Sequence, residues 1–306
     1  MARRHVLLLR SLVPVLATLW LWGAGVSPAT GDGPARGSLG PGDLITRVGI
    51  TVKVPPRGEG VWATKELIGG GGATLGVETG TDGSVRVHLL DAGHPGGAAV
   101  TASSQSDGEP RPPCRDGSYN RSGTHWRSTY LWYFKTRSRP DGMSRTNAVD
   151  ALRSGAANIT RARNNCGLTD GVGARQSYGG RTRAAADIGK NARCLAPDGR
   201  NVVSFGNLPS SYVAYTCWWT SGSATVQADV KLNKADHAWT ARVRDSCTRR
   251  FSVEAVATHE FGHVFGLKHV SESSDGRLTM SSVIRPCQNS ETTLGLGDIK
   301  GLEASY

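Results

Sequence analysis

The chain has 306 residues and a formal charge of +11, with 40 glycines, 14 prolines and six cysteines. Its glycine content is far below the one third of a collagen-like chain, and eight tryptophans with seven tyrosines exclude a fully disordered one. The length suggests about two domains, and an apolar content of 38% favours a modest core with loop-rich polar segments.

The first thirty residues have the order of a secretory signal peptide. Three arginines precede an apolar run over residues 11–26, and small residues follow. A membrane anchor is the alternative, but the run is shorter than the roughly 20 residues that a spanning helix needs and Pro14 interrupts it. We therefore predict a cleaved signal peptide over 1–30, secretion, and no stable membrane insertion of the mature chain.

The basic charge has two interpretations. It is typical of proteins that bind polyanions, but it also suits a soluble secreted protein. The arginines are scattered and form no long tract. We therefore favour the second interpretation and expect a monomer with no specific nucleic-acid partner.

The residues after the signal predict a small β-rich region between two linkers. Residues 31–43 and 101–113 are rich in glycine, proline and small residues, which is typical of linkers. Between them, residues 44–100 predict a small antiparallel β unit, which is either a propeptide or an accessory module. Its alternating apolar runs cover residues 45–54, 74–78 and 85–90.

The pattern changes at Cys114, and residues 114–306 predict one further domain of the α/β (α+β) class. The spacing of apolar residues predicts helices over 147–159, 252–265 and 299–304. Expected strands cover residues 129–136, 202–205, 213–218 and 225–232.

All six cysteines lie after residue 110, and the chain has no Cys-x-x-Cys pair. An even number of widely spaced cysteines in an exported chain predicts three disulfides. Cys166 with Cys194 and Cys247 with Cys287 would each close a compact loop. The six candidates are Cys114, Cys166, Cys194, Cys217, Cys247 and Cys287.

The segment from His259 to His269 carries the chemistry. His259 and His263 are four residues apart, so a helix places them on one face, where both can bind one zinc ion at about 2.0–2.1 Å. Gly266 can end that helix in the left-handed conformation. His269 can then supply a third nitrogen, and three protein ligands leave a fourth position for water, as in catalytic sites.

Glu260 lies roughly 100° around the helix from His259, where it can reach that water. It is the predicted general base, which takes a proton from the water and then delivers it to the leaving amine. These residue types and their roles indicate amide hydrolysis without a covalent intermediate. The alternatives are a basic secreted binding protein with a non-catalytic zinc site, and a zinc hydrolase of a non-peptide amide.

HExxHxxGxxH over residues 259–269, followed by Met280, resembles the metzincin clan of zinc endopeptidases. Within the clan the chain is most similar to matrixin-like peptidases, especially bacterial secreted members. This resemblance implies a twisted mixed sheet, an active-site helix and a Met-turn, with peptides or proteins as substrates. It also implies that Met280 lies beneath the zinc ligands and that Asp298 is a buried structural carboxylate.

The resemblance implies further roles. Residues 228–233 would be the edge strand that binds substrate, and residues 283–286 would line a primed-side pocket. No histidine lies between 166 and 224, so a second zinc ion is not expected, and calcium stays possible but unassigned. Cys114 weakly resembles a propeptide cysteine that occupies the zinc site, although a disulfide is the favoured expectation.

Overall fold

The computed structural model describes residues 39–91 and 109–306. The predicted signal peptide and most of both predicted linkers lie outside these residues. Within them, no helix is long and apolar enough to cross a membrane. The described part combines one large mixed sheet with few helices, which confirms the predicted fold class.

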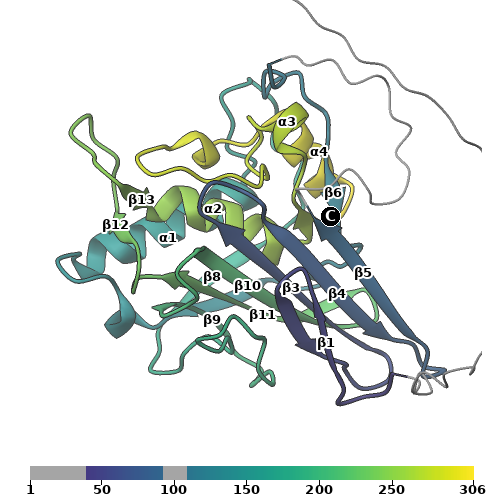
Figure 1. Ribbon diagram of the computed structural model, residues 1–306. Coiled ribbons are helices and arrows are strands. Elements are labelled where there is room, and N and C mark those ends of the chain that lie inside the picture. The colour runs from purple at the N-terminus through teal and green to yellow at the C-terminus, as the bar shows by residue number, and fades with distance from the viewer. Residues whose placement is uncertain (1–38, 92–108) are drawn as a thin grey trace, which may run out of the picture. The chain divides into compact units, whose positions relative to one another are not determined.

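The sheet has eight strands in the order β5-β4-β3-β10-β11-β9-β7-β8 (Figure 1). Its first five strands pair in antiparallel fashion, and the strands from β11 to β8 are parallel neighbours. The strands of this sheet are β3 (Glu59–Leu67), β4 (Ala73–Thr79), β5 (Val85–Asp91), β7 (Tyr130–Phe134), β8 (Gln176–Arg181), β9 (Asn201–Gly206), β10 (Tyr212–Ser221) and β11 (Ala224–Asn233).

Three small two-stranded sheets and a few helices complete the fold. The remaining strands are β1 (Leu44–Arg47), β2 (Ile50–Lys53), β6 (Asn120–Arg121), β12 (Ala238–Thr240), β13 (Arg250–Ser252) and β14 (Leu267–Lys268). The helices are α1 (Arg145–Thr160), α2 (Val253–Val264), α3 (Glu272–Asp275) and α4 (Leu296–Glu303), with short 3-10 turns at Thr136–Ser138 and Ser290–Thr292.

Each face of the sheet has its own hydrophobic core. Helices α1 and α2 lie across one face (Figure 1), where Leu152 and Phe261 pack with Trp132 and other sheet residues. The hairpin β1–β2 and a loop near Ile188 cover the other face. Apolar and aromatic side chains therefore stabilise the sheet from both sides.

The strand β3 joins the N-terminal region, residues 39–91, to the rest of the protein. It lies between β4 and β10, and its pairing with β10 extends from Leu67 opposite Tyr212 to Glu59 opposite Ser221. Trp62 and Trp218 lie opposite each other in this register and stack with ring centroids 5.8 Å apart. The N-terminal region is therefore part of the same eight-stranded sheet as strands β7 to β11.

Several elements differ from the sequence-based expectation. The run over residues 45–54 forms the hairpin β1–β2, with a turn at Val48 and Gly49. The sequence pattern predicts neither β3 nor β8. Residues 228–233 belong to β11, which pairs with β10 on one side and β9 on the other, so the expectation of an edge strand there is wrong.

Three disulfides link the six cysteines, and no free cysteine remains among the described residues. The pair Cys247–Cys287 is confirmed. The pairing of Cys166 with Cys194 is wrong, because each of these cysteines is bonded to a different partner. The other two disulfides are Cys114–Cys166 and Cys194–Cys217.

Candidate metal centre

Helix α2 positions the first two histidines. It begins at Val253, where the Ser252 hydroxyl accepts a hydrogen bond from the backbone N–H of Ala255 at 3.2 Å. That cap satisfies one of the free N–H groups in the first turn. His259 and His263 follow on one face of the helix, and both are completely buried.

Gly266 redirects the chain after α2 so that His269 returns to the helix. Its φ is 88°, a conformation that favours glycine. A Cβ at this position would lie 2.4 Å from the carbonyl oxygen of Thr124. The sequence-based expectation for the end of this helix agrees with this geometry.

The Nε2 atoms of His259, His263 and His269, the histidine cluster, converge on one point. Their separations are 3.0, 3.2 and 3.3 Å. The Nδ1 of His259 donates to the carbonyl of Thr279, and that of His263 donates to the carbonyl of Leu267. These bonds fix the tautomer of His259 and His263, so the Nε2 lone pairs of these two rings point into the cluster.

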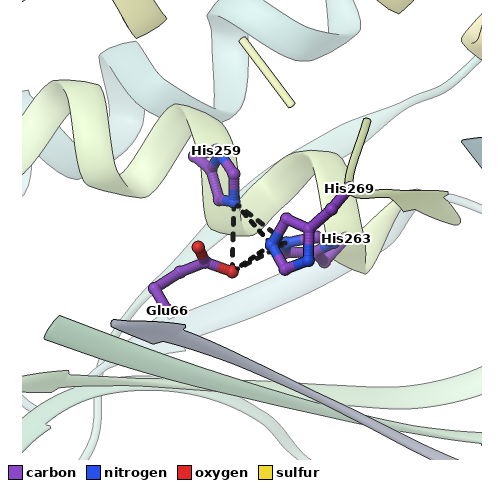
Figure 2. Close-up of side chains that lie close together, drawn as sticks. All are labelled: Glu66, His259, His263 and His269. Atoms are coloured by element: carbon purple, nitrogen blue, oxygen red, sulfur yellow. Dashed lines mark hydrogen bonds and ion pairs between the residues drawn. The ribbon is translucent and has the colours of Figure 1, made fainter. Parts of the chain in front are cut away.

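Glu66 of β3 joins the histidine cluster, and the sequence pattern does not predict it. Its Oε1 lies 3.2 Å from Nε2 of His259 and 3.3 Å from Nε2 of His263, and it also contacts His269. Figure 2 shows this oxygen beside the three imidazole nitrogens. Glu66 is 1% exposed, so the carboxylate lies inside the protein.

The geometry of these four residues fits a zinc ion. Four ligand atoms placed tetrahedrally at about 2.0–2.1 Å from one ion lie roughly 3.3–3.4 Å apart, which is close to five of the six observed separations, all but that between Glu66 and His269. Three facing imidazole lone pairs repel one another unless a cation or proton lies between them. The donor set of three imidazoles and one carboxylate is one that zinc prefers.

Glu260 lies beside the cluster as a separate acidic group. It is completely buried, and its Oε2 accepts a hydrogen bond from the Thr216 hydroxyl of β10 at 2.5 Å. Its Oε1 has no hydrogen-bond partner among the described residues. Glu260 therefore has one carboxylate oxygen held by β10 and a second one available for a proton.

Burial and the charges of neighbouring residues together set the pKa values in this centre. Burial raises the pKa of Glu260 to about 8, and the nearby charge of Glu66 adds to the effect. Burial also acts to raise the pKa of Glu66, but the charges of His269 and His259 outweigh it and hold that pKa well below its usual range. Burial lowers the pKa of His263 to about 3, which favours the neutral imidazole that binds metal ions.

Met280 and Asp298 support the cluster from below. A Cβ on Gly262, in the turn of α2 between the two histidines, would lie 2.3 Å from the sulfur of Met280. The buried carboxylate of Asp298 accepts hydrogen bonds from the backbone N–H groups of Thr279, Met280 and Gly295. Asp298 thereby fixes the turn at Met280 to the start of α4.

The structure brings together most of the residues predicted for the site: the three histidines, Glu260, Gly266, Met280 and Asp298. The six cysteines lie elsewhere, in the three disulfides. Sequence reasoning missed Glu66 and Thr216. The one available signal was that a strand over 59–67 would place Glu66 on the same face as Trp62 and Thr64.

One comparison with known proteins found a family model that matches part of the chain. Residues 214–306 match the family model of the matrixin peptidases. This stretch begins in β10 and contains the histidine cluster, Glu260 and Met280. No curated protein matches the sequence. The predicted resemblance to matrixins is confirmed, and matrixins are zinc metallopeptidases.

Proposed function

Because residues 214–306 are matrixin-like, we propose that the protein is a secreted zinc endopeptidase that hydrolyses peptide bonds with Glu260 as general base and acid. The observation that carries this proposal is the convergence of three Nε2 atoms beside a buried carboxyl group that contacts none of them as a ligand. One zinc ion is the cofactor, and no second metal site is assigned.

His259, His263 and His269 would hold the zinc ion through Nε2, with their orientation fixed by the carbonyls of Thr279 and Leu267 for the first two. When bound, zinc supplies the Lewis acidity that polarises a carbonyl group and lowers the pKa of water. Glu260 then takes a proton from the attacking water on its free Oε1 and delivers it to the leaving nitrogen. The hydroxyl of Thr216 holds Oε2 during both transfers.

The extracellular setting is part of the proposal. Three disulfides support folding in an oxidising compartment, and the first thirty residues have the sequence of a cleaved signal peptide. We assign residues 114–306 as the catalytic domain and residues 44–100 as a separate functional region, with peptides or proteins as substrates of a monomer.

A basic secreted binding protein with a non-catalytic zinc site is the second candidate. Glu66 favours it, because four protein donors around one ion are typical of structural sites. Glu260 argues against it, since a structural site gains nothing from a further buried carboxyl group with an unpaired oxygen. Burying a carboxyl group with an unpaired oxygen destabilises the fold. Buried groups of this kind are typical of functional sites.

Replacement of Glu260 tests the proposal. Glu260→Gln should reduce kcat for casein or peptide hydrolysis by about a hundred- to ten-thousandfold, since proton transfer is lost, while bound zinc stays near one ion per chain. The measurement compares both proteins, intact and after limited proteolysis, with and without a chelator. Full activity in Glu260→Gln, or hydrolysis that a chelator leaves unchanged, contradicts the proposal.

A further inference from the structure

The strand β10 is the place where an extended peptide would join this sheet. Without β3, β10 would be an edge strand, with one row of backbone N–H and C=O groups unpaired. Extended peptides bind such edges by adding a strand. Thr216 of this strand holds Glu260, so a peptide that pairs with β10 passes the proposed general base.

The N-terminal region occupies that edge. All nine residues of β3 lie along β10, and Thr64 is opposite Thr216. At the end of this strand, Glu66 places its carboxylate oxygen against the three Nε2 atoms, as Figure 2 shows. The strand therefore fills both the peptide edge and the fourth ligand position of the metal centre.

The turn after β3 covers the parts of the metal centre and of the neighbouring segment that β3 itself does not contact. A Cβ at Gly72 would lie 2.8 Å from Cε1 of His269, and a Cβ at Gly70 would lie 2.5 Å from Cγ2 of Val283. Val283 begins the segment that the sequence analysis assigned to a primed-side pocket. His259, Glu260 and His263 have no exposed surface, and Glu66 and His269 are each 1% exposed, so a peptide has no route to the cluster.

We propose that the N-terminal region is an intramolecular inhibitor, with β3 in the place of a substrate strand and Glu66 as the fourth zinc ligand. This inference rests on the proposed peptidase function and adds its regulation. A cysteine ligand is not needed for latency, because Cys114 is bonded to Cys166. No disulfide joins residues 39–91 to the rest of the protein, since all six cysteines lie at or after residue 114.

Because residues 39–91 are covalently linked to the rest of the protein, the carboxylate of Glu66 can compete with substrates for the metal ion. A ligand on the same chain acts at an effective concentration that reaches the millimolar range. Cutting the connection between β5 and Glu109 makes the contact bimolecular, and dilution then favours separation. Val61 and Ala63 belong to the same buried hydrophobic cluster as Trp219, and this packing holds the region in place at high concentration.

The first test examines the fourth ligand position in the full chain. Cobalt(II) in place of zinc gives visible absorption bands that respond to a change of ligand. In the wild-type protein, acetohydroxamate should leave these bands unchanged, because Glu66 fills the position. In Glu66→Ala it should shift them. Glu59→Ala, at the exposed far end of β3, is the matched control and should behave as wild type.

The second test separates the N-terminal region without altering Glu66. A recognition sequence for a site-specific protease is inserted between β5 and Glu109, and the cut protein is assayed at micromolar and nanomolar concentrations. Peptidase activity per molecule should rise at least about a hundredfold on dilution, while the N-terminal fragment separates on gel filtration. The uncut protein should show no such rise.

The outcomes distinguish the two proposals. The inhibitor is refuted if wild-type cobalt bands shift with acetohydroxamate as much as those of Glu66→Ala, or if the cut protein hydrolyses peptides equally well with the fragment bound and after it has separated. If the fragment leaves and acetohydroxamate then binds, but no peptide is cut, the assignment of Glu66 stands and the peptidase function fails.

Discussion

Asp229 lies in β11, away from the metal centre, and its carboxyl group is completely buried. It accepts hydrogen bonds from the backbone N–H groups of Asp187 and Val202. Burial, together with the nearby charges of Asp187 and Asp198, nevertheless raises its pKa to about 8. The folded protein therefore holds a proton on Asp229 at a pH at which the unfolded chain has lost it.

This shift predicts a pH dependence of stability. A raised pKa contributes stability below the unfolded value of about 4, and this contribution is lost as the pH rises through about 8. Between about pH 5 and pH 8, the free energy of unfolding of the wild type should fall by about 1 kcal/mol or more relative to Asp229→Asn. Denaturant unfolding measures this slope, and Asp150→Asn on an exposed part of α1 is the control. Equal slopes in wild type and Asp229→Asn would refute the prediction.

At the residue scale, the sequence predicts contacts that depend on local geometry alone. His259, Glu260 and His263 lie within two turns of α2, so helix periodicity fixes their relation. Glu66 precedes His269 by 203 residues. Its position depends on the pairing of β3 with β10, which no local spacing encodes.

At the scale of elements, the two long helices begin with the same kind of cap in different surroundings. Ser252 accepts from Ala255 N–H at the buried start of α2, and Ser144 accepts from Asn147 N–H at the exposed start of α1. When the cap is removed, water can reach the exposed N–H group. The buried N–H group stays unpaired, which costs more free energy.

Ser252→Ala should therefore destabilise the protein by about 2 kcal/mol, and Ser144→Ala by about 0.5–1 kcal/mol. Chemical denaturation of the two variants beside the wild type gives both values. If Ser144→Ala lowers the free energy of unfolding as much as Ser252→Ala does, burial does not control the strength of these caps.

The strands that the sequence failed to predict lack a simple alternation. β3 is buried on both faces because Trp62 belongs to one hydrophobic core and Val61 and Ala63 belong to the other, and glycine and charged residues interrupt its apolar run. Helix α1, by contrast, buries one face and shows the expected spacing, whereas α2 is buried on all sides. Strand order in a sheet is set by pairing between distant segments, which explains the wrong assignment of residues 228–233 to an edge.

At the scale of the molecule, the metal centre joins the N-terminal region to the C-terminal half. Zinc that binds only the folded chain stabilises it by about 4 kcal/mol when free zinc is a thousand times Kd. For a chain of this size, Tm should rise by roughly 10 °C. Thermal unfolding with zinc and with chelator measures the difference, and His263→Ala should abolish most of it. A Tm that zinc does not change would refute the metal site.

The stacked rings of Trp62 and Trp218 belong to the two strands that must part if the N-terminal region leaves. Because their ring centroids lie only 5.8 Å apart, the two indoles should couple electronically and give a split band in the circular dichroism spectrum. That band exists only while the rings face each other. The decay of this band would measure how fast the N-terminal region separates, in an unlabelled sample and without any substrate.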